Sequence, residues 1–77
     1  MHDKEFISDF PAHKKKIKFL LGSDNNFREV AEDYIYCKKT LEKLKQLNKD
    51  SLAQQYSETL EDLKLEILDS ILKINYK

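Results

Sequence analysis

The side chains that could do chemistry are few in this 77-residue sequence, and their spacing is not that of a catalytic site. It has one cysteine, Cys37, and two histidines, His2 and His13, which are too far apart to share a helix face. A metal site, or a nucleophile with its base, needs several such groups at defined spacing. The single glycine argues against the usual phosphate-cradling loops. We therefore predict a protein that is not an enzyme and has no metal or cofactor.

The lone Cys37 fits a structural role better than a redox role. It falls on a regularly spaced apolar row, where a cysteine usually behaves as a small buried hydrophobe. One cysteine cannot form an intrachain disulfide, which suits a reducing compartment. The first ten residues contain no apolar leader core, and apolar runs such as 19–21 are far too short to cross a bilayer. These features predict a cytoplasmic chain without membrane insertion.

A short basic run could bind phosphate groups. Lys14, Lys15, Lys16 and Lys18 could neutralise phosphates of nucleic acid or of anionic lipid, with salt-sensitive affinity. The competing interpretation is the solvated face of a short helix. We favour the latter, because 14 basic and 14 acidic residues cancel and Phe19 is the only aromatic nearby that could stack on a base. Weak nucleic-acid or membrane-surface binding remains the alternative function.

The elements that carry these residues should all be helices. Charged residues make up 36% of the chain and there is one glycine and one proline, a composition typical of long helices with few turns. Caps and apolar periodicity predict a single domain over residues 1–77, with a loosely docked segment at 1–8. The predicted helices cover residues 10–21, 25–47 and 52–75.

Cap residues set the predicted bounds of the first helix. Asp9 is a plausible N-cap, and Pro11 falls in the first turn, where its missing N–H costs nothing. Gly22 is placed to take the left-handed conformation that ends a helix.

The other two helices also have cap candidates. Asp24 is the preferred N-cap of the second helix, and Asn26, which is followed by Glu29, is the alternative. The stretch 48–50 is typical of a turn, and Ser51 followed by Gln54 is the capping-box pattern that would open the third helix.

Two apolar rows predict an antiparallel hairpin. Apolar residues recur in steps of three and four along 27–44 and, apart from Ser70, along 53–74, the pattern of a coiled-coil seam. With a turn near 49–51, facing residues have numbers that sum to about 100, so Cys37 should face Leu63. The same sum sets the lysines of the second helix opposite the acids of the third. The predicted fold is all-α: a short N-terminal helix, then a long antiparallel two-helix hairpin.

The third helix carries a second apolar row that the hairpin does not need. Exposed apolar stripes often mark interfaces, and this row could be covered by the first helix of the same chain or of another. We predict a non-enzymatic helical interaction module that self-associates, most simply as a homodimer, or binds another protein. The candidate interface residues are Leu65, Leu68 and Leu72 of the third helix, and Ile17, Leu20 and Leu21 of the first.

Several of these residues also carry a resemblance to a known family. The relevant positions are Phe10-Pro11, the run 24–27, Tyr34, Leu41-Glu42, Leu60 and the run 64–71. Over about residues 10–74 the chain resembles the YdcH-like family of small uncharacterised bacterial proteins, which carry a domain of unknown function and are thought to form coiled-coil hairpins. The resemblance implies a bacterial hairpin protein and no specific activity. Leu68 and Ser70 depart from it, standing where the family usually has lysine and glutamate, and Leu63 is more apolar than expected.

Overall fold

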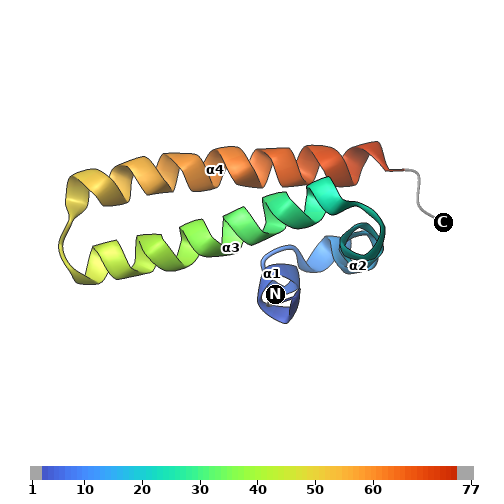
Figure 1. Cartoon of the computed structure of the whole chain (residues 1–77), viewed down its shortest axis with the longest axis horizontal. Coiled ribbons are helices and arrows are strands. Elements are labelled where there is room, and N and C mark those ends of the chain that lie inside the picture. Colours follow the sequence, from blue (N-terminus) through green and yellow to red (C-terminus); the bar gives the residue numbers. More distant parts are fainter. Residues whose placement is uncertain (1–2, 75–77) are drawn as a thin grey trace.

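The computed structural model describes residues 3–74 and confirms the all-α fold (Figure 1). Two long helices lie side by side and antiparallel, and the N-terminal elements pack against the open end of this hairpin, away from its turn. The elements are α1 (Asp3–Ser8), a 3-10 turn η1 (Pro11–His13), α2 (Lys14–Ser23), α3 (Asn25–Gln46) and α4 (Asp50–Lys73).

A single extended residue separates α2 from α3. Asp24 has φ −129° and ψ 106°, and its carboxylate accepts a hydrogen bond from the Phe27 N–H at 3.1 Å, so its predicted role as N-cap is confirmed. Because Asp24 itself ends α2, the helix continues through Gly22 to Ser23. No glycine in the described range has a positive φ, so the left-handed stop predicted at Gly22 is wrong.

The first predicted helix is therefore divided. Residues 11–13 form a 3-10 turn, and the α-helix begins only at Lys14. Asp9 is not the N-cap: Phe10 and His13 stand at those positions, and neither makes a side-chain capping bond. The Asp9 carboxylate instead accepts hydrogen bonds from Tyr34 and Lys38 of α3.

The turn between α3 and α4 is built by the backbone. Asn48 is left-handed, with φ 57°, which asparagine tolerates better than most residues. Its N–H donates to the Lys45 carbonyl, and the Lys49 N–H donates to the Leu44 carbonyl at 3.0 Å, the Schellman pattern of a helix end.

The predicted bounds of α4 need correction at both ends. The helix begins at Asp50, with Lys49 at the N-cap position and no side-chain capping bond, so the capping box at Ser51 is wrong. The negative charge of Asp50 in the first turn complements the helix dipole instead. The helix ends at Lys73, because Ile74 is already extended.

The N-terminal segment belongs to the core, so the prediction that residues 1–8 dock loosely is wrong for 3–8; residues 1–2 lie outside the described residues. Phe6 is fully buried, and its ring centroid lies 5.4 Å from that of Phe10 and 5.6 Å from that of Tyr34. Large aromatic side chains bury much area, so α1 adds substantial core volume. The connected buried cluster contains Phe6, Phe10, Ile17, Leu20, Leu21, Phe27, Ala31, Tyr34, Ile35, Ile67 and Ile71.

The register of the hairpin differs from the predicted one. The Cys37 sulfur donates a hydrogen bond at 3.3 Å to the carbonyl of Tyr56, a residue seven positions before the Leu63 that the sum predicted as its neighbour. The reason is the turn, which is centred near residue 48 because α4 begins early. The ion pairs among the side chains of residues 4–74 are Lys38–Asp9 and Lys73–Asp69, and neither joins α3 to α4.

Candidate interaction surfaces

The outer row of α4, which we define as Leu65 and Leu72, is open to solvent. These two residues stand a heptad apart on the same face of the helix, and their exposed fractions are 65% and 73%. Leu68 lies between them but is partly buried and packs against the core cluster. The predicted second apolar row is thus present, with two of its three leucines exposed.

The first-helix part of the predicted interface is buried within the chain. Ile17, Leu20 and Leu21 are 0%, 6% and 4% exposed and belong to the same core cluster as Ile67 and Ile71 of α4. Of the two arrangements that the sequence left open, the structure has α2 docked on its own hairpin. These three residues are therefore core residues of the single chain, and their role in an intermolecular surface stays a prediction.

The basic run divides over two surfaces. Lys14, Lys15 and Lys18 are exposed, whereas Lys16 is half-buried. Lys14, Lys15 and Lys16 line an open cavity of about 510 Å³ together with η1. Lys18 instead lines two cavities beside α1, and Lys14 lines one of these as well.

A groove between α1 and α2 combines apolar and basic side chains. It consists of two cavities of about 400 and 390 Å³ that share Lys4, Ile7 and Lys18. We define the α1–α2 groove by three apolar and four basic residues. The apolar residues are Ile7, Pro11 and Leu21. The basic residues are Lys4, Lys14, Lys18 and Arg28.

Part of the basic edge of the groove is held in place. The Arg28 guanidinium of α3 donates to the Leu21 carbonyl at the end of α2, which fixes this cation beside the groove. Sequence reasoning missed the groove because it left α1 undocked. The adjacent apolar residues Phe6 and Ile7 within a charged stretch were the available indication that α1 is an element of the fold.

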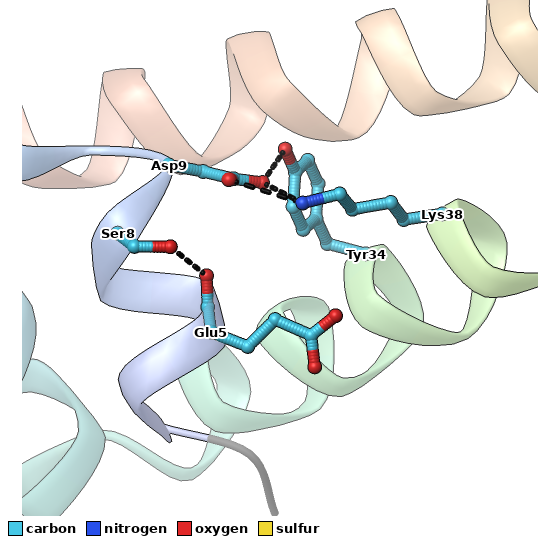
Figure 2. Close-up of polar contacts among 5 residues, drawn as sticks. All are labelled: Glu5, Ser8, Asp9, Tyr34 and Lys38. Carbon is cyan, nitrogen blue, oxygen red and sulfur yellow. Dashed lines mark hydrogen bonds and ion pairs between the residues drawn. The ribbon is translucent and has the colours of Figure 1, made fainter.

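A partly buried polar clasp fastens the N-terminal segment to α3 (Figure 2). The Asp9 carboxylate accepts hydrogen bonds from the Tyr34 hydroxyl at 2.7 Å and from the Lys38 ammonium at 2.8 and 3.0 Å. The Lys38 and Asp9 side chains are only 27% and 22% exposed. Charge-assisted bonds of this kind are among the stronger hydrogen bonds in proteins.

The clasp changes the acidity of both of its acidic groups. Burial raises the pKa of the Asp9 carboxyl, but the Lys38 and Tyr34 hydrogen bonds and the Lys38 charge outweigh burial, so the pKa is lowered overall. Burial and the adjacent Asp9 carboxylate raise the pKa of the Tyr34 hydroxyl well above its usual range. At neutral pH the group is an ionised carboxylate held by a cation and a neutral phenol, an arrangement that stabilises structure.

Cys37 has the environment of a structural cysteine. It is 3% exposed, and burial raises the pKa of its thiol. Reactive cysteines have lowered pKa values and are partly exposed, so the position does not favour redox chemistry.

Two further features of the described residues bear on other functions. Within residues 3–74 no group of three or more histidine, cysteine or acidic side chains is placed to hold a metal ion. None of the helices in this range combines the length and the apolar character needed to cross a membrane.

Comparison of the chain with protein-family models, with curated proteins and with solved structures finds no match in any of the three. The resemblance to the YdcH-like family therefore stays a prediction, and a proposal of function depends on the surfaces described above.

Proposed function

We propose that this chain is a non-enzymatic helical interaction module that self-associates, and that the outer row of α4 is its contact surface. The observation that carries the proposal is the exposure of Leu65 and Leu72 on one face of a well-packed helix. Burying a leucine side chain is worth about 1.5–3 kcal/mol, so pairing these residues across an interface would be favourable. Another protein that presents an apolar helix face could use the same row.

Sedimentation analysis over a range of concentrations tests this function. Wild-type protein should sediment with increasing mass as concentration rises, and Leu65→Lys with Leu72→Lys should sediment as a monomer of unchanged helicity, because lysine is nearly as good a helix former as leucine. Tyr36→Lys is the matched control, since Tyr36 is 67% exposed on α3 and should not affect association. A wild-type chain that remains monomeric at every concentration would refute self-association.

The structure also changes which leucine should be substituted. Leu68→Lys is the substitution that the sequence alone favours, but Leu68 packs partly against the core. A charge at that position would perturb both folding and association, so its effect on mass could not be assigned to an interface. The two exposed leucines avoid this ambiguity.

A second candidate is weak binding of nucleic acid or of an anionic membrane surface through the basic run. The exposure of Lys14, Lys15 and Lys18 supports it. Binding to an oligonucleotide or to phosphatidylglycerol vesicles should then weaken steeply with salt and with Lys15→Gln. Binding that is independent of both would exclude this candidate.

We also propose a reducing, cytoplasmic location, which the single buried thiol of Cys37 supports. Expression of a fluorescent fusion in a bacterial host, followed by cell fractionation, would test it. Recovery of the fusion from the periplasm would contradict it.

A further inference from the structure

We propose that the α1–α2 groove is the acceptor for the outer row of α4 of a second copy of this chain, so that the molecules associate head to tail. This inference rests on the proposed function, self-association through the outer row, and adds the surface that this row meets.

The groove offers four cations around apolar side chains. Lys4, Lys14, Lys18 and Arg28 form no ion pair with another side chain of residues 4–74. The nearby Asp9 carboxylate is already neutralised by Lys38. The lining of the groove therefore contains four cations and no carboxylate, in a chain whose formal net charge is zero.

The solvent face of α4 has the complementary character. Leu65 and Leu72 share this face with Glu58, Asp62 and Asp69, all of them exposed. Asp69 is paired with Lys73 at the surface, whereas Glu58 and Asp62 form no ion pair within the described residues. The face thus presents two leucines among unbalanced carboxylates, and the groove presents apolar side chains among cations.

Charge decides between the two ways in which the outer row could be covered. If two outer rows met each other, the carboxylates of both chains would be brought together, and like charges across an interface are costly. If the row meets the groove, each carboxylate approaches a cation while the leucines contact Ile7 and Pro11, which are at least partly exposed. Both arrangements bury the leucines, but only the second pairs opposite charges.

The geometry allows each chain to use both surfaces at once. In Figure 1, α4 lies along one edge of the molecule, and α1 and α2 lie at the other. A contact between two different surfaces is heterologous, so it leaves one groove and one row free and can repeat until a ring closes. We therefore expect assemblies larger than a dimer at high concentration.

Mixing two variants, each with one surface disabled, tests the inference. The groove variant carries Lys14→Gln and Lys18→Gln and retains its outer row. The row variant carries Leu65→Lys and Leu72→Lys and retains its groove. Each variant alone should associate at least about tenfold more weakly than wild type, because its own contact lacks one side. An equimolar mixture should form a dimer and nothing larger, because only one productive contact remains.

A matched control separates this contact from general electrostatics. Lys43→Gln with Lys45→Gln removes the same charge from exposed positions on α3, far along the helix from the groove. This variant should associate as wild type does. Circular dichroism should show that all the variants keep the wild-type helicity, since every substituted side chain is exposed.

The possible outcomes distinguish the inference from the function on which it rests. If the groove variant alone associates as wild type does and the row variant does not, the outer rows meet each other, and the inference fails while self-association stands. If the two variants do not associate when mixed, the groove does not receive the row, and the inference also fails. If the groove substitutions leave association unchanged but abolish binding to phosphatidylglycerol vesicles, the groove serves a lipid surface. A wild-type chain that never associates would overturn both proposals.

Discussion

The two ends of the hairpin are built differently. At the open end, α1 and α2 pack on α3 and α4 and enclose the rings of Phe6, Phe10, Phe27 and Tyr34. At the turn end, only α3 and α4 are present, and Leu47 and Leu52 are about half exposed. The connected core cluster includes neither Leu41 nor Ala53, although both are buried.

This difference shows what a heptad pattern does and does not provide. The two seams bring α3 and α4 together along their whole length, but a pair of helices can bury only one face of each. The enclosed core forms where the N-terminal segment adds a further layer. Most of the stability should therefore come from the open end, where the N-terminal segment docks although it has no heptad pattern.

The largest expected effect comes from removing the innermost ring of the open end. Phe6→Ala should lower the free energy of unfolding by about 3–5 kcal/mol, because it leaves a cavity at a fully buried position. Leu41→Ala at the turn end should cost about 2–3 kcal/mol, since that site is thinly covered and can relax. Urea denaturation followed by circular dichroism measures both. Equal losses would mean that the two ends contribute alike.

The clasp gives the next largest effect, and it depends on pH. Asp9→Asn should cost about 1.5–3 kcal/mol at neutral pH, because it removes the charge that Lys38 and Tyr34 bind. The pKa of Asp9 is lowered in the folded state, so its contribution is complete above the unfolded-state pKa and is lost as pH falls through the lowered value. Thermal unfolding of both proteins from pH 7 to pH 2 should therefore show the difference disappearing only in acid.

The second ion pair provides the control for this prediction. Asp69→Asn removes the exposed pair with Lys73, and it should leave stability nearly unchanged at every pH. If Asp69→Asn were as costly as Asp9→Asn, burial would not be what gives the clasp its strength.

Thiol labelling compares the core of the open end with the adjoining part of the hairpin. Cys37 lies on α3 between the clasp residues Tyr34 and Lys38 and outside the connected core cluster, and it should be modified slowly in native buffer and rapidly in denaturant, because it is buried. In a Cys37→Ala background, Ala31→Cys places the thiol in the core cluster of the open end. We expect labelling there to be at least about tenfold slower than at Cys37, because local opening is easiest where packing is thinnest. Equal rates would show that the hairpin opens as one unit.

The smallest expected effect is a gain in stability on replacing Gly22. A Cβ at Gly22 would meet no atom within 4 Å, and the residue is inside α2 without a positive φ. Gly22→Ala should raise the free energy of unfolding by about 0.5–1 kcal/mol, since glycine is a poor helix former. The melting temperature measures this gain. A loss would indicate that the end of α2 needs glycine for a reason that the structure does not show.

Sequence reasoning predicted the fold class and the two long helices because helix caps and heptads are local patterns. Asp24 illustrates this success, since the residue that it caps is three positions away. The register failed because it depends on the centre of one short turn, and α4 begins at Asp50 instead of residue 52, which moves that centre earlier by about two residues. An error that small shifts every facing pair along the helix.

The candidate surfaces were less predictable than the fold, because they depend on where α1 docks. Leu65 and Leu72 were identified from their position outside the seam, and they are exposed. The burial of Ile17 within its own chain could not be predicted, because an apolar face looks the same in sequence whether its own chain or another covers it. The clasp could not be found from spacing, since Asp9 and Tyr34 are 25 residues apart.

The long separation within the clasp also has a consequence for the order of folding. The Asp9–Lys38 bond joins residues 29 apart, across the whole of α2, whereas the turn joins α3 to α4 through neighbouring residues. Contacts that close long loops tend to form after local ones, because the loop entropy must be lost before the contact contributes. We therefore expect the hairpin to form first and the N-terminal segment to dock after the rate-limiting step. Weakening the clasp should then accelerate unfolding and leave the folding rate almost unchanged, so that the lifetime of the native state is set by the part of the chain that folds last.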